Sequence, residues 1–132
     1  MILDRCPWRT CALLGIRTAG TLNTHFVRGA LLGNTVVTEV LKNRLNRGLP
    51  PELYFWRDKT GHEVDLLVDD PEEPCVIEVK GSRPVHGSML DGFTYHRALN
   101  KRGARYLLLH EGSASWDREG IEVRNWTSLF RN

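Results

Sequence analysis

Two short segments of the sequence carry carboxylates and a lysine at the spacing of strand residues. The first contains Glu63 and Asp65, and the second contains Glu78 and Lys80. Because alternate side chains of a strand point to the same side, the members of each pair are predicted to share one face. The opposite, buried face would then be formed by the apolar neighbours Val64, Leu66, Val68, Ile77 and Val79.

The connection between these segments, from Asp69 to Pro74, is short and turn-like, and it predicts a hairpin. In a symmetric register, Glu63 faces Lys80 in an ordinary cross-strand ion pair, while Asp65 faces Glu78. Two carboxylates directly opposite each other are unfavourable unless another group compensates their charge. A divalent cation would do so, because Mg²⁺ is usually held by one or two carboxylates together with water and a substrate phosphate.

A cation at Asp65 and Glu78 would make phosphodiester hydrolysis possible. Mg²⁺ or Mn²⁺ supplies polarisation of a phosphoryl oxygen and a hydroxide nucleophile, and Lys80 would position water or stabilise the charge that develops on phosphorus. The same spacing is also typical of solvent-facing charges that keep a half-exposed hairpin soluble. The spacing alone leaves both interpretations open.

The elements that would position these residues follow from hydrophobic periodicity. Apolar residues at three- and four-residue steps indicate helices, and alternation with charged residues indicates strands. The predicted elements are a helix from about His25 to Asn46, strands at Leu53 to Asp58, Gly61 to Val68 and Cys75 to Lys80, a second helix from about Met89 to Lys101, and strands at Ala104 to Leu109 and Ile121 to Val123. This order, α-β-β-β-α-β-β, predicts an α/β fold with a mixed central sheet flanked by helices.

Length and composition restrict the class of protein. A chain of 132 residues is expected to form a single domain, and 41% hydrophobic with 26% charged residues is typical of a folded globular protein. No apolar run approaches the length of a membrane span, and no signal peptide precedes the domain, so we expect a cytoplasmic protein without membrane contact. The three cysteines form no C-x-x-C pair and are expected to be reduced thiols.

Several segments also occur in the order and spacing of a known family. They are Leu13 to Ile16, Arg28 to Leu31, Leu53 to Asp58, Gly61 to Asp65 and Ile77 to Lys80, with a weaker match as far as Trp126. Over nearly its whole length the sequence resembles the C-terminal domain of unknown function that follows the AAA+ ATPase domain in a large group of prokaryotic ATPases. Residues 1–12 fit this family least well.

Members of that family are held to resemble PD-(D/E)XK nucleases, so the resemblance implies a restriction-endonuclease-like core. It assigns Asp65, Glu78 and Lys80 to an acid-acid-lysine site, with Asp65 and Glu78 as metal ligands, and makes Glu63 an auxiliary acid. It also implies DNA, a partner protein or a separate ATPase domain as the binding partner.

The sequence departs from the family pattern in two ways. Gly33 stands where an acid is expected in the first helix, and Glu39 lies on a different face of that helix, so metal binding would be impaired. No G-x-x-x-x-G-K-[ST] motif occurs, so we expect no ATPase domain and no ATP hydrolysis in this chain.

The net charge of +2 is too small for nucleic-acid binding through bulk charge, so any such contact must be local. The candidates for phosphate contact are the basic residues near the ends of the two helices, namely Lys42, Arg44, Arg47, Lys101, Arg102 and Arg105. Basic residues at helix C-termini are explained equally well by the helix dipole. The histidines lack metal-ligand spacing, and the tryptophans are assigned to packing.

Two functions follow. The first is a nuclease-like accessory domain that carries out Mg²⁺-dependent phosphodiester hydrolysis on DNA, impaired by Gly33. The alternative is a non-catalytic DNA- or protein-binding regulatory module with the same fold.

Overall fold

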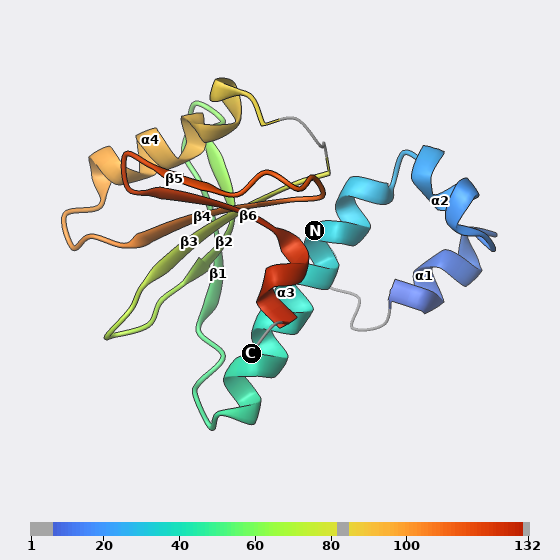
Figure 1. Ribbon diagram of the computed structural model, residues 1–132. Helices are drawn as coiled ribbons and strands as arrows, with labels where there is room; N and C mark the ends of the chain where they lie inside the picture. The colour runs from blue at the N-terminus through green and yellow to red at the C-terminus, as the bar shows by residue number, and fades with distance from the viewer. Residues whose placement is uncertain (1–6, 82–84, 131–132) are drawn as a thin grey trace.

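The computed structural model describes residues 7–81 and 85–130 and shows a mixed α/β fold (Figure 1). The elements are α1 (Pro7–Leu13), α2 (Ala19–Thr24), α3 (Arg28–Asn46), β1 (Leu53–Arg57), β2 (Glu63–Val68), β3 (Cys75–Lys80), the 3-10 helix η1 (Gly87–Leu90), α4 (Asp91–Leu99), β4 (Arg105–His110), β5 (Trp116–Arg118), β6 (Ile121–Asn125) and the 3-10 helix η2 (Trp126–Phe130). None of the helices in these ranges is both long and apolar enough to cross a membrane.

The strands form one mixed sheet in the order β1-β2-β3-β4-β6-β5. β3, β4 and β6 are parallel to one another, while β1, β2 and β5 pair antiparallel with their neighbours. The hairpin of β2 and β3 therefore places β3 in the interior of the sheet. This confirms the predicted mixed sheet and the position of the hairpin near its centre.

α3 covers one face of the sheet because its apolar residues recur along one side of the helix. Leu32, Val36 and Val37 are buried against a group of strand residues, which are Leu66, Val68, Ile77, Val79, Leu107 and Leu109. Each such side chain contributes roughly 1.5–3 kcal/mol when it is fully buried. α3 ends where Gly48 adopts a φ of 70°, with the Leu49 N–H donating to the Arg44 carbonyl at 2.9 Å, the arrangement of a Schellman C-cap.

α4 covers the other face of the sheet, opposite α3 (Figure 1). Its Phe93 is buried in a second cluster with Val64, Val76, Tyr106, Leu108, Ile121 and Val123. The start of α4 approaches β2 so closely that a Cβ at position 92 would collide with the carbonyl oxygen of Glu63. Glycine at position 92 therefore sets the distance between this helix and β2.

The structure corrects one predicted burial pattern. Ile77 and Val79 pack under α3 as predicted, which leaves Glu78 and Lys80 on the other face of β3. Val64 does not share a face with Leu66, since it packs in the α4 cluster. The cause is an irregularity in the pairing of β1 with β2, whose register shifts between Tyr54 and Trp56.

Other elements were not predicted. α1, α2 and β5 are additional, and the second helix begins as η1 before it continues as α4. β5 and β6 are joined by Glu119 and Gly120, which both have positive φ values of 53° and 75°, as a two-residue hairpin turn requires. Of the segment that fits the family least well, residues 1–6 lie outside the described residues and the remainder falls in α1.

Candidate acidic site between two central strands

The site lies where β2 and β3 stop pairing. Their ladder joins Leu66, Leu67 and Val68 to Ile77, Val76 and Cys75, and it ends there. Continued by one more pair, this register would place Asp65 opposite Glu78, as predicted. The opposed carboxylates therefore lie just beyond the last paired residues, where the two strands have room to separate.

Beyond the end of the ladder, the Asp65 side chain forms a hydrogen bond to the backbone of β3. Its Oδ2 accepts a hydrogen bond from the Val79 N–H at 2.7 Å. Burial raises the pKa of Asp65, and the charge of Glu63 adds to this, whereas the Val79 N–H and Lys80 act in the opposite direction. The Asp65 carboxylate is thus part of the connection between the two strands.

Glu78 is a buried carboxylate with only 5% of its surface exposed. Its Oε1 lies 2.5 Å from the Lys80 Nζ, whereas its Oε2 is buried without a hydrogen-bond partner among the described residues. Burial, followed by the charge of Asp65, raises the pKa of Glu78 to about 7, although the Lys80 ammonium lowers it. Near neutral pH, Glu78 therefore exists in both protonation states.

Lys80 compensates the acidic pair within the protein itself. Burial lowers its pKa, but the hydrogen bond and charge of Glu78, with the charges of Asp65 and Glu63, outweigh this and raise the pKa. Its side chain remains 34% exposed. The repulsion between carboxylates that the sequence predicted is thus relieved partly by Lys80 and by the Val79 amide, and burial is the larger cause of the raised carboxylate pKa values.

The predicted ion pair between Glu63 and Lys80 is wrong. Glu63 instead lies 4.0 Å from Arg57 of β1, and Lys80 pairs with Glu78 on its own strand. Glu63 lies opposite Arg57 because β2 is still paired with β1 at this residue but is no longer paired with β3. Glu63 remains close enough for its charge to affect Asp65 and Lys80.

Gly33 lies on the same side of α3 as Val37. Val37, one turn further along the helix, lines a pocket together with Asp65, and Gly33 shares this side because residues four apart lie one above the other. A Cβ at position 33 would have no neighbour within 4 Å. The helix therefore has room for a larger side chain at position 33, where an acid was expected.

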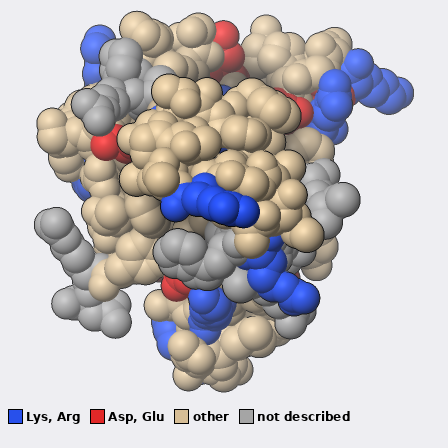
Figure 2. Space-filling model, turned by 90° about the vertical axis from the view of Figure 1, so that its right-hand side faces the viewer, with Lys and Arg blue, Asp and Glu red and all other residues tan. Residues whose placement is uncertain are grey.

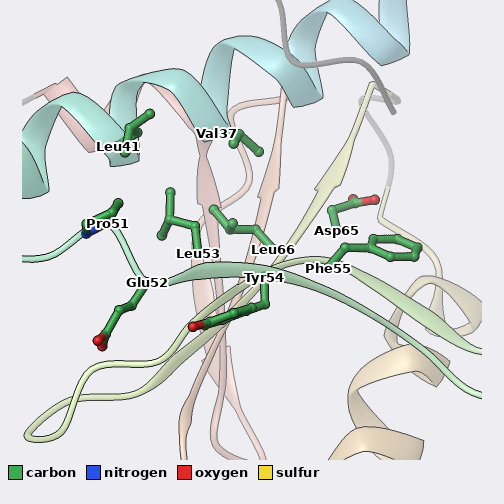
Figure 3. Close-up of a pocket in the computed structure, with 9 residues that line it drawn as sticks. All are labelled: Val37, Leu41, Pro51, Glu52, Leu53, Tyr54, Phe55, Asp65 and Leu66. Atoms are coloured by element: carbon green, nitrogen blue, oxygen red, sulfur yellow. The ribbon is translucent and has the colours of Figure 1, made fainter.

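That pocket has a volume of about 520 Å³ and lies between α3 and the edge strand β1. In Figure 3, Val37 and Leu41 project from α3 toward Leu53 and Leu66, and Asp65 lies at one end of the pocket. Sequence reasoning missed it, because its walls come from elements that are distant in the chain. The aromatic residues of β1 were the available signal, since Tyr54 and Phe55 are 54% and 57% exposed.

The sequence analysis also missed a contact between the start of α3 and the end of β3, next to the site. Arg28, the first residue of α3, forms an ion pair with Glu111 and donates from Nη1 to the Gly81 carbonyl at 3.2 Å. The backbone of Gly29 lies close to Gly81, since a Cβ at position 81 would be 3.6 Å from the Gly29 Cα. The Arg-Gly pair thus fixes the start of α3 at the end of β3, directly after Lys80.

Asp65 and Glu78 are the carboxylates of the site that could hold a divalent cation. Among residues 7–81 and 85–130, no group of three or more His, Cys, Asp or Glu side chains is placed to hold a metal ion. Mg²⁺, however, is commonly held by only one or two carboxylates, with water and phosphate as the other ligands. Asp65 and the buried, unpartnered Oε2 of Glu78 fit this two-carboxylate type.

The candidate nucleic-acid residues lie in two groups, which both contact Asp70. Lys42, Arg44 and Arg47 line a single pocket with Arg105, whereas Arg102 lies across the hairpin loop, bound to Asp69 at 3.1 Å and to the carbonyls of Asp70 and Pro71. Lys101 is exposed and does not line that pocket. On the face shown in Figure 2, Lys and Arg side chains occur at several places rather than in one continuous basic patch.

The described residues therefore form an α/β domain with two carboxylates and a lysine grouped between its central strands. Residues 28–129 match the family model described as Domain of unknown function (DUF4143), and the chain belongs to this family. The match begins at the first residue of α3 and extends into η2, so it includes every residue of the acidic site. No curated protein and no solved structure matches the chain.

Proposed function

We propose that this domain is a nuclease-like accessory domain that hydrolyses phosphodiester bonds of DNA with the help of Mg²⁺. The observation that carries the proposal is the buried, unpartnered Oε2 of Glu78 beside Asp65, with the Lys80 ammonium attached to the same carboxylate. A carboxylate oxygen buried without a donor is costly, and a cation or a proton would remove that cost.

Asp65 and Glu78 would hold the ion, which when bound supplies a polarised phosphoryl oxygen and a hydroxide nucleophile. Lys80 is charged and about one third exposed, so its ammonium can contact a phosphate oxygen and stabilise charge on phosphorus. The Val79 N–H holds Asp65 in place through Oδ2. Glu63, on the adjoining end of β2, adds negative charge that favours a cation.

The proposal includes a restriction-endonuclease-like core and a role beside an AAA+ ATPase domain. The mixed sheet, with α3 and α4 on opposite faces and the acidic hairpin in its interior, supports the first part. The resemblance of the sequence to the domain that follows such ATPases supports the second. The two parts are tested separately, by measuring binding of the chain to DNA and to an AAA+ ATPase domain.

A second candidate is a non-catalytic module that binds DNA or a partner protein. Two observations favour it: position 33 lacks the expected acid, and Lys80 already neutralises Glu78 at 2.5 Å. A lysine that holds the carboxylate this closely competes with a metal ion for it. In this case the acidic group would be a retained structural feature of the fold.

The two candidates are distinguished by parallel assays of metal binding and DNA cleavage. Manganese binding is measured by calorimetry, and cleavage is measured on supercoiled and single-stranded DNA with Mg²⁺, Mn²⁺ or a chelator. We expect cleavage that requires the metal, is lost in Glu78→Gln and Lys80→Met, and is retained in Glu72→Gln, an acidic control exposed on the hairpin loop. Absence of both manganese binding and cleavage in the wild-type protein would leave only the non-catalytic module.

A further inference from the structure

A second pocket, of about 470 Å³, lies beneath the C-terminal half of α3. It touches Cys75 and Arg105, the first residues of β3 and β4, whereas Glu78 and Lys80 lie toward the opposite end of β3. The two sites are therefore separate. Its charged lining consists of Glu39, Lys42, Arg44, Arg47 and Arg105, so four cations face one carboxylate.

Arg44 provides a buried donor in this pocket. Its side chain is only 7% exposed, and it is fixed by two hydrogen bonds, from Nε to the Pro50 carbonyl at 2.8 Å and from Nη1 to Asp70 at 2.9 Å. Its Nη2 is also buried, yet it has no hydrogen-bond partner among the described residues. A buried guanidinium nitrogen without an acceptor is unfavourable, so an anion that reached it would be bound strongly.

Two further cations can contribute to anion binding. Arg47 makes no ion pair with any described residue, and Lys42 pairs only with Glu39, on the surface of the same helix at 2.8 Å. Surface pairs of this kind are weak, so Lys42 can exchange its partner. Arg105 is different, because two of its nitrogens are bound to Glu122 at 2.5 and 2.9 Å.

Apart from Asn43 and Asn46, the rest of the pocket wall is largely apolar. Val40, Leu129 and Phe130 form part of it, and the Phe130 ring is 44% exposed. Exposed aromatic rings beside a cationic group are suited to a planar base attached to a phosphate, because the base can stack on the ring. The volume is within the usual range for small-molecule sites and exceeds what inorganic phosphate needs.

We propose that this pocket binds a nucleotide, with its phosphate on Arg44 Nη2, Arg47 and Lys42 and its base against Phe130 and Leu129. The same chemistry is presented by a free mononucleotide and by the phosphorylated end of a DNA strand. The proposal does not depend on the acidic site, since it shares no residue with Asp65, Glu78 or Lys80.

Binding is tested by calorimetry with adenosine monophosphate, adenosine and inorganic phosphate, in the presence of a chelator. We expect adenosine monophosphate to bind more tightly than either of its parts. Arg47→Gln should weaken this binding by roughly tenfold, the loss that accompanies one charge-assisted hydrogen bond, and Phe130→Ala should weaken it as well. Arg118→Gln, an equal charge change at an exposed position outside the pocket, should bind as the wild type does.

Arg44→Lys keeps the charge but removes the buried Nη2 donor, so it should bind adenosine monophosphate more weakly than the wild type. Its folding is checked by circular dichroism, because Arg44 also holds Pro50 and Asp70. Glu78→Gln should bind adenosine monophosphate normally, which separates this site from the acidic one. A comparison of adenosine monophosphate with a 5′-phosphorylated oligonucleotide then identifies the source of the phosphate. Failure of the wild type to bind either ligand, or equal affinity in the wild type and Arg47→Gln, would overturn the proposal.

Discussion

Glu78 makes the stability of the domain depend on pH in a direction that a single substitution can test. Folding raises the pKa of Glu78 from 4.5 to about 7, mainly because the carboxyl is buried. Between these two pH values the folded state keeps a proton that the unfolded state has released. The contribution of Glu78 to the free energy of unfolding must therefore fall as the pH rises through this range.

The side-chain amide introduced by Glu78→Gln has no proton to release, so this variant should not share the fall. At about 1.4 kcal/mol per pH unit, the difference between the pKa values amounts to about 3 kcal/mol, and most of it accrues between about pH 5 and about pH 8. The stability gap between Glu78→Gln and the wild type should widen by that amount over this range. Lys80 is present in both proteins, and its exposed portion keeps it hydrated after its partner is neutralised.

The assay is urea unfolding followed by circular dichroism at a series of pH values, with chelator present because a bound cation would keep Glu78 ionised. Glu72→Gln is the matched control, since the Glu72 side chain is exposed on the hairpin loop and should show a nearly constant gap. A constant gap for Glu78→Gln as well would refute the reasoning. It would mean that Glu78 is ionised in the folded protein at no cost, with Lys80 compensating it fully.

Three further predictions concern Asp65 and two glycines. Asp65→Asn keeps an acceptor for the Val79 N–H and removes a charge that burial disfavours, so with chelator present its stability should be unchanged or higher. Asp65→Ala should lose about 1–2 kcal/mol of stability in urea unfolding. Equal losses of stability in the two variants would show that the charge itself is structural. Gly33→Ala should stabilise α3 by about 1 kcal/mol, because its Cβ meets open space. Gly92→Ala should destabilise the domain, because its Cβ would meet the Glu63 carbonyl. Similar melting temperatures for the two variants would contradict this prediction. Gly33→Glu should bind manganese more tightly than the wild type or Gly33→Ala in calorimetry, and three equal affinities would show that position 33 is not the missing ligand position.

Local patterns in the sequence were sufficient for most of the central elements. β3 has the predicted bounds, and α3 and β2 begin only a few residues later than predicted, because their periodicity arises from burial of one side of each element. β5 was missed because it is only three residues long and its pairing with β6 depends on the Glu119-Gly120 turn. Such short elements form through tertiary contacts and carry little periodicity of their own.

The details of the site depend on contacts that a single strand does not encode. The predicted register agrees with the pairs that the structure forms, but it could not show that the ladder stops at Leu66, before Asp65 and Glu78. That end results from the irregular pairing of β2 with β1, on the far side from β3. It explains why Glu63 pairs with Arg57, why Val64 packs under α4, and why Lys80 is left to neutralise Glu78.

The two candidate functions differ in whether the Lys80 ammonium can leave the Glu78 carboxylate when a metal ion binds. In the structure, Lys80 supplies the positive charge that a metal ion would otherwise supply, at 2.5 Å from Oε1. A cation that bound Oε2 and Asp65 would weaken this contact, and the released ammonium would then be available to a phosphate. An active site therefore requires that metal binding and the Lys80–Glu78 contact oppose each other, so Lys80→Met should raise manganese affinity while it abolishes cleavage. In a purely structural group the same substitution would leave Glu78 buried without its cation, and the protein would lose stability without gaining affinity for manganese.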